Sequence, residues 1–168
     1  MTLQRFEATQ LISAPLDEAW AFFSDPRNLS AITPPDMGFE ITSEVPDHIY
    51  PGLFVTYRVR PLLGVPVEWV TEITQVDEGS RFIDEQRMGP YRLWHHEHTF
   101  RPAGDMTEMR DVVYYALPFG RLGALALPVV RSRIERIFEY RADVLDERFN
   151  HRYRSRPSVA GTPTAAYV

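Results

Sequence analysis

The sequence predicts an α+β fold in which a curved antiparallel sheet of about seven strands wraps around a long C-terminal helix, with two short helices after the first strand. Residues 39–117 read as strand-like segments separated by short turns, which is typical of an antiparallel meander. Apolar residues between 129 and 150 recur at helical spacing. A curved sheet needs its concave face covered, and this last helix is the only large amphipathic element available to cover it.

The first part of the chain predicts one strand and two short helices. Leu3 to Ile12 has the alternation of a strand. A proline and two acidic residues open the segment Pro15 to Phe23 and favour a helix there. Asp25 is an N-cap for a second helix, Pro26 to Ile32, and Thr33-Pro34-Pro35 ends it because proline cannot continue the backbone hydrogen bonds.

The rest of the chain predicts six more strands, the long helix and a tail. The strands are Phe39 to Val45, Leu53 to Pro61, Pro66 to Val76, Arg81 to Met88, Tyr91 to Arg101 and Thr107 to Leu117. The helix runs from Val129 to Asn150, and Arg141 interrupts its apolar stripe, so we expect this side chain to reach solvent or an inward carboxylate such as Asp84. Residues 1–154 form a single domain in this prediction, and residues 155–168 a disordered tail.

Composition excludes several classes of function. The chain has 168 residues, no cysteine and no lysine, which excludes thiolate and Schiff-base chemistry and cysteine-ligated metal. A net charge of -5 argues against nucleic-acid binding. The N-terminus has no signal-peptide pattern, and the longest apolar run, Leu122 to Val130, is too short to span a bilayer. We therefore expect a soluble cytoplasmic protein without stable membrane insertion.

The segment Leu93 to Phe100 holds three of the five histidines and alternates like a strand. Trp94, His96 and His98 then share an inward face, and His95 lies on the opposite one. Buried imidazoles need partners, because an unpaired buried polar group is costly.

Strand register supplies those partners. A turn near Gly104 places His98 opposite Asp111 and Trp94 opposite Tyr115. A turn at Gly89-Pro90 places Asp84 beside His96 and Gln86 beside Trp94. We expect a hydrogen bond between His98 and Asp111, and Asp84 as the partner of His96. The inward polar group predicted in this way consists of Asp84, Gln86, His96, His98 and Asp111.

The order of elements resembles the SRPBCC superfamily (START and polyketide cyclases), in particular its bacterial cell-division-inhibitor-like, ligand-binding subgroup. The resemblance covers about residues 4–149 and includes local motifs at Ile12-Ser13-Ala14-Pro15, Asn28-Leu29, Thr33-Pro34-Pro35, Gly89-Pro90, Asp111-Val112-Val113-Tyr114-Tyr115 and Pro118-Phe119-Gly120. It implies a helix-grip fold with a cavity for a hydrophobic or amphipathic ligand. It does not settle whether a member carries, cyclises or hydrolyses that ligand.

Three interpretations of the polar group remain open: a self-satisfied buried network, part of a ligand-binding lining, and a metal site in which two histidines and an aspartate supply three ligands. We expect a small apolar or amphipathic molecule to bind between the sheet and the C-terminal helix, with no cofactor and no assigned metal ligand. The expected lining is Trp69, Asp84, Gln86, Trp94, His96, His98, Asp111, Tyr115, Ile134 and Phe138. One alternative is a cyclase/dehydratase- or hydrolase-like enzyme with His98 and Asp111 as general acid and base; another is a protein-interaction module. The sequence does not predict the oligomeric state.

Overall fold

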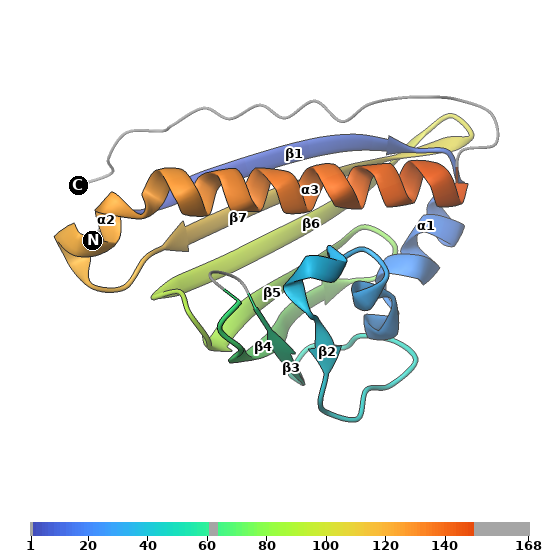
Figure 1. The fold of residues 1–168 in the computed structure, drawn as a ribbon. Helices are drawn as coiled ribbons and strands as arrows, with labels where there is room; N and C mark the ends of the chain where they lie inside the picture. Colours follow the sequence, from blue (N-terminus) through green and yellow to red (C-terminus); the bar gives the residue numbers. More distant parts are fainter. Residues whose placement is uncertain (1, 61–63, 150–168) are drawn as a thin grey trace.

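The computed structural model describes residues 2–60 and 64–149. In this part of the chain, seven strands form one antiparallel sheet in the spatial order β1-β7-β6-β5-β4-β3-β2 (Figure 1). The strands are β1 (Gln4–Ile12), β2 (Glu40–Ile41), β3 (Leu53–Val59), β4 (Val67–Asp77), β5 (Arg81–Met88), β6 (Leu93–Ala103) and β7 (Met106–Ala116). The helices are α1 (Leu16–Phe23), the short 3-10 helices η1 (Pro26–Ser30) and η2 (Pro35–Met37), α2 (Gly120–Leu125) and α3 (Leu127–Phe149).

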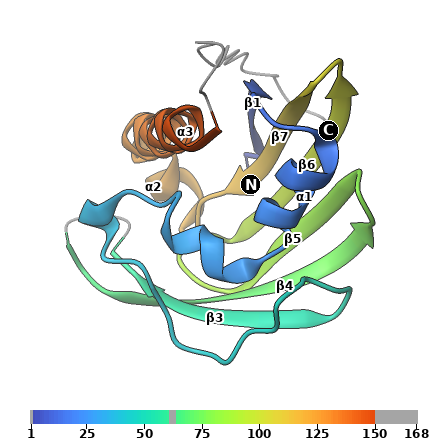
Figure 2. The same ribbon diagram turned by 90° about the vertical axis from the view of Figure 1, so that its right-hand side faces the viewer.

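The sheet curves around α3, which lies along β1 across the concave side of the sheet (Figures 1 and 2). Helix α1 and the short helices lie on the same side, and α1 is near the C-terminal end of α3, where the rings of Phe22 and Phe149 are in contact (Figure 1). The pairing of β4 with β5 shifts register at two places, Val70/Thr71 and Ile73/Gln75. Irregularities of this kind bend a strand and so contribute to the curvature of the sheet. A hydrogen bond of 3.1 Å from Gln10 Nε2 to the carbonyl of Ala142 ties β1 to α3. This is the helix-grip arrangement, and it confirms the predicted fold class.

Strand register agrees with the prediction at the histidines. His98 pairs with Asp111 across β6 and β7, and Asp84 pairs with His96 across β5 and β6. The β5–β6 ladder ends at Glu85 and His95, so the predicted pairing of Gln86 with Trp94 is absent from it. The Gln86 amide closes the turn instead, because its Nε2 donates to the Tyr91 carbonyl at 2.6 Å and its Oε1 accepts from the Tyr91 N–H at 3.2 Å.

The predicted second strand and second short helix are shorter in the structure. The strand expected over Phe39 to Val45 is reduced to Glu40–Ile41, because the N–H groups of Thr42 and Ser43 both donate to the carbonyl of Thr56 and the regular ladder stops there. The second short helix is a 3-10 helix that ends at Ser30 rather than Ile32. Asp25 caps it as predicted, since its side chain accepts a hydrogen bond from the backbone N–H of Arg27.

Helix α3 begins two residues before the predicted Val129 and includes Pro128 in its first turn, where a missing N–H is tolerated. Its buried residues recur at helical spacing, as the sequence predicts, and are Val130, Ile134, Phe138, Arg141, Ala142 and Leu145. The strand predicted over Leu53 to Pro61 ends at Val59, since the N–H of Arg60 donates to the carbonyl of Met37. The positions of Pro61 and Asn150 and the tail over 155–168 lie outside the described residues.

The apolar interior falls into two clusters. The smaller one joins β1 and β7 to the first half of α3 and contains Phe6, Ala8, Val113, Tyr115, Val130, Ile134 and Phe138. The larger one joins α1 and the short helices to β3, β4 and the end of α3. None of the described helices is long and apolar enough to cross a membrane.

Candidate functional site

A cavity of about 180 Å³ lies between the sheet and α3. Most of its lining is apolar: α1, the short helices and the loop after η1 contribute Phe22, Phe23, Pro26, Leu29, Ile32 and Met37; the sheet contributes Val55, Val59, Trp69, Ile73, Phe82 and Trp94; α3 contributes Ile134, Ile137 and Phe138. Polar groups gather where β5 and β6 face α3, at Asp84, His96, His98 and Arg141. A mostly apolar hollow with a few convergent polar groups is the usual form of a small-molecule site.

Seven of the ten predicted lining residues border this cavity, namely Trp69, Asp84, Trp94, His96, His98, Ile134 and Phe138. Gln86, Asp111 and Tyr115 are not among its lining residues. Gln86 is engaged in the turn before β6, and Tyr115 belongs to the packed cluster beneath the first half of α3. Asp111 is buried on β7 next to both histidines.

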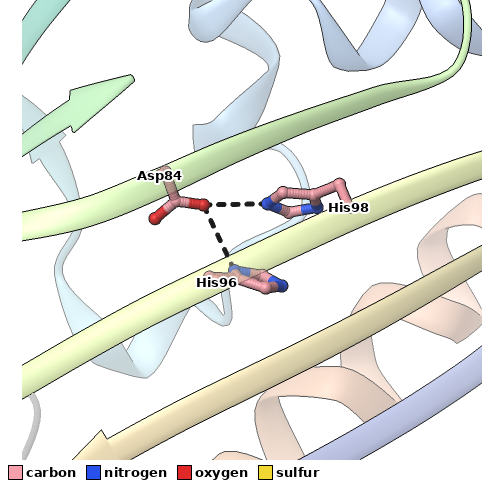
Figure 3. Close-up of side chains that lie close together, drawn as sticks. All are labelled: Asp84, His96 and His98. Carbon is pink, nitrogen blue, oxygen red and sulfur yellow. Dashed lines mark hydrogen bonds and ion pairs between the residues drawn. The ribbon is translucent and has the colours of Figure 1, made fainter. Parts of the chain in front are cut away.

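The two histidines and two aspartates form a closed group in which each imidazole lies between two carboxylates. His96 Nε2 is 2.9 Å from Asp111 Oδ1, and His96 Nδ1 is 3.3 Å from Asp84 Oδ2. His98 Nε2 is 2.8 Å from Asp84 Oδ2, the same oxygen that faces His96 (Figure 3). His98 Nδ1 lies 2.8 Å from Asp111 Oδ1 at an angle outside hydrogen-bond geometry. Ring stacking with Phe82, at a centroid distance of 4.0 Å, holds the His98 plane.

The hydrogen bonds run diagonally across the predicted pairs. We expected His98 to bind Asp111 and His96 to bind Asp84, as the register places them. The structure joins His96 to Asp111 and His98 to Asp84 by the properly aligned bonds, and the directly opposite contacts are the longer or misaligned ones. The register prediction was correct, and the predicted hydrogen-bond partners were wrong because imidazole nitrogens extend well beyond Cβ and reach diagonal neighbours.

Burial and charge oppose each other in this group. Burial alone would lower the pKa of His96, but the charge of Asp84 and the hydrogen bond to Asp111 outweigh it and raise that pKa. Burial alone would raise the pKa of both carboxyl groups. The charges and hydrogen bonds of the histidines outweigh it and hold the pKa of Asp84 and of Asp111 well below the usual range. Both aspartates are therefore anionic at neutral pH.

Arg141 completes the charged group from the helix side. Its side chain is 9% exposed, and its Nη1 lies 3.6 Å from Asp111 Oδ1, so the inward carboxylate that it approaches is Asp111 rather than the expected Asp84. The guanidinium stacks over the Phe138 ring at 4.7 Å. Its Nε and Nη1 have no hydrogen-bond partner among the described residues, and neither has the indole N–H of Trp69.

The prediction missed the lining that comes from outside the histidine strands. Phe22 and Phe23 of α1 were not among the expected lining residues, yet they border the cavity. Tyr57 also lines it, and its hydroxyl is 2.7 Å from Thr71 Oγ1 on the neighbouring strand. Strand parity could have placed Tyr57, since it shares the inward face with Val55 and Val59. The loop and 3-10 residues carry no such periodic signal.

Together the curved sheet, the spanning helix and the hollow beneath it define a helix-grip protein with a ligand-sized cavity. The chain belongs to the family described as polyketide cyclase/dehydrase and lipid transport, whose model matches residues 12–139. No curated protein sequence matches the chain.

Solved structures share the fold at low sequence identity. The Zhui aromatase/cyclase from Streptomyces sp. R1128 is 15% identical, with a TM-score of 0.70 over 92% of this chain and 98% of that one. A START superfamily protein from Mycobacterium smegmatis is 15% identical, with a TM-score of 0.64 over 87% and 97%. Protein Ms6760 from the same organism is 22% identical, with a TM-score of 0.62 over 85% and 88%. These likenesses establish the fold.

Proposed function

We propose that the protein binds a small, compact amphipathic molecule in the cavity beneath α3. The observation that carries this proposal is the cavity itself, a hollow of about 180 Å³ whose lining is mostly apolar, with a group of polar side chains where β5 and β6 face α3. An engineered apolar cavity of about 150 Å³ binds benzene, so a molecule of one or two fused rings is of suitable size. Family membership supports a hydrophobic ligand.

The polar end of the cavity favours an amphipathic ligand over a purely apolar one. The indole N–H of Trp69 and the Nε and Nη1 of Arg141 make no hydrogen bond among the described residues, although a buried donor without a hydrogen bond is costly. A hydroxyl, carbonyl or carboxylate oxygen on the ligand would supply an acceptor. The apolar remainder would lie against the aromatic rings of α1 and the sheet.

Tryptophan fluorescence gives a direct test, because Trp69 and Trp94 both line the cavity. Titration with 2-naphthol is expected to change the emission and raise the melting temperature, and naphthalene, which lacks the oxygen, is expected to bind more weakly. Trp20, which is buried against Phe82 and Phe100 outside the lining, gives a background signal that a Trp20→Phe variant removes. Unchanged emission and melting temperature across a library of compact ring alcohols, ketones and acids would overturn the proposal.

The geometry gives less support to the enzyme with His98 and Asp111 as acid and base. A general base needs a nitrogen free to reach its substrate. Both nitrogens of His98 face carboxylates, and Asp111 is not part of the cavity lining. Binding therefore remains the function that the arrangement favours, with the expected cytoplasmic location still a prediction.

A further inference from the structure

We propose that Asp84, His96 and His98 form a binding site for a divalent first-row transition metal ion such as Zn²⁺. The three side chains converge from β5 and β6, and one ligand atom from each lies within 4.8 Å of the others (Figure 3). The proposal concerns this site alone and does not depend on the cavity holding an organic ligand.

The spacing at Asp84 suits coordination. Asp84 Oδ2 lies 2.8 Å from His98 Nε2 and 3.3 Å from His96 Nδ1. Bonds of about 2.1 Å at tetrahedral or octahedral angles place ligand atoms about 3.0 to 3.4 Å apart, so small side-chain rotations bring the set to a metal. Two imidazoles and one carboxylate on one side of an ion leave the opposite positions open.

Asp111 provides the support that metal-bound histidines need. When His96 Nδ1 and His98 Nε2 bind the ion, the other nitrogen of each ring carries the proton and faces Asp111 Oδ1, at 2.9 and 2.8 Å. A carboxylate behind a ligating histidine fixes its tautomer and its orientation. Asp111 is hydrogen-bonded to His96, and its contact with His98 Nδ1 is misaligned, so a small rotation of the His98 ring on metal binding would let one buried aspartate support both rings.

Charge favours a cation at this place. With neutral imidazoles, Asp84 and Asp111 face a single nearby guanidinium, that of Arg141, which leaves one excess negative charge in a buried group. This excess attracts a divalent ion, whose binding changes the net charge of the group from −1 to +1. Because Asp84, His96 and His98 line the cavity and Asp111 does not, the open coordination positions face the hollow.

The chain contains a matched control on the opposite face of the same two strands. Glu85 and His95 pair at 2.7 Å, yet their side chains are 28% and 32% exposed and they lie outside the three-residue group. Glu85→Gln and His95→Gln therefore make the same chemical changes as Asp84→Asn and His98→Gln away from the proposed site.

The experiment is calorimetric titration of untagged, EDTA-treated protein with Zn²⁺, together with the visible absorption of the Co²⁺ form. We expect one ion per chain, at least about 100-fold weaker binding in Asp84→Asn and His98→Gln, and about 10- to 100-fold weaker binding in Asp111→Asn. Glu85→Gln and His95→Gln are expected to bind as the unmodified protein does. Val55→Phe, which fills the cavity, is also expected to keep the ion, so loss of the organic ligand and loss of the metal are separable.

The unmodified protein alone can refute the proposal, even if a variant fails to fold. A dissociation constant above about 100 µM for Zn²⁺, with no ligand-field absorption from Co²⁺, would show that these side chains form only a hydrogen-bonded network and no metal site. Undiminished binding in folded Asp84→Asn and His98→Gln, judged by circular dichroism, would place the ion elsewhere and equally overturn it.

Discussion

His98 Nε2 donates its best hydrogen bond to the carboxylate of Asp84, a diagonal neighbour on β5, although the residue opposite His98 on that strand is Phe82. The Nε2 to Oδ2 distance is 2.8 Å, and both side chains are largely shielded from water. The Glu85–His95 pair on the outer face spans the same strands at 2.7 Å but is about one-third exposed. The protein thus carries an inner and an outer version of one interaction.

The inner pair should be energetically coupled and the outer pair should not. In a double-mutant cycle of Asp84→Asn and His98→Gln, we expect a coupling free energy of about 1–3 kcal/mol, since buried charged partners depend on each other. For Glu85→Gln and His95→Gln we expect less than about 0.5 kcal/mol, because solvent screens the pair. Urea unfolding of the metal-free protein measures both, and equal coupling in the two cycles would contradict this account.

Sequence reasoning succeeded where a periodic pattern or a turn sets the geometry. The alternation of Leu93 to Phe100 places His96 and His98 inside, and the turn near Gly104 sets His98 opposite Asp111. It failed where side-chain length decides, because register gives Cα neighbours and not the diagonal reach of an imidazole. The cavity contribution of Leu29 and Met37 depends on how non-periodic segments pack across the hollow, which no local pattern encodes.

Stability of the metal-free protein should depend on pH on both sides of a mildly acidic optimum. The pKa of His96 is higher in the folded protein than its ordinary value of 6.5, so protonated His96 stabilises the folded state. This stabilisation is fully present below pH 6.5 and is lost as the pH rises through the pKa of the folded state. The lowered pKa of Asp84 and of Asp111 means that their stabilisation is present above 3.8 and is lost as the pH falls. The free energy of unfolding from urea titrations should therefore be highest between these two values.

His96→Gln should flatten the alkaline side of that profile, because it removes the group whose proton is lost there. His95→Gln, on the outer face, is the control and should leave the profile unchanged. If the free energy of unfolding of His96→Gln still falls above pH 6.5, the decline is due to the titration of another group.

Phe119 offers a separate stability test outside the cavity. It is the only non-glycine residue with positive φ in the described part of the chain, at φ 64° and ψ 20°, and it is 81% exposed. The left-handed conformation costs a residue with a Cβ about 1 kcal/mol, and asparagine tolerates it best. Phe119→Asn should therefore raise the free energy of unfolding by about 0.5–1 kcal/mol. Phe119→Ala retains the strained Cβ and should gain little, so an equal gain in both variants would point to the lost aromatic surface instead.

Two valine-to-phenylalanine substitutions should distinguish the cavity from the packed part of the interior by their different effects on stability. Val55 on β3 is 4% exposed and lines the cavity, whereas Val113 on β7 is 0% exposed and belongs to the packed cluster beneath α3. The larger ring enters empty space in Val55→Phe but must displace neighbours in Val113→Phe. We expect Val113→Phe to lower the free energy of unfolding by about 1–3 kcal/mol and Val55→Phe by less than about 1 kcal/mol.

Because the new ring occupies the space of the ligand, Val55→Phe should weaken 2-naphthol binding at least about tenfold, a loss of about 1.4 kcal/mol. Thermal and urea unfolding with fluorescence titration measure these effects, and a Val55→Phe protein that is as destabilised as Val113→Phe and still binds 2-naphthol would show that the two sites are packed alike.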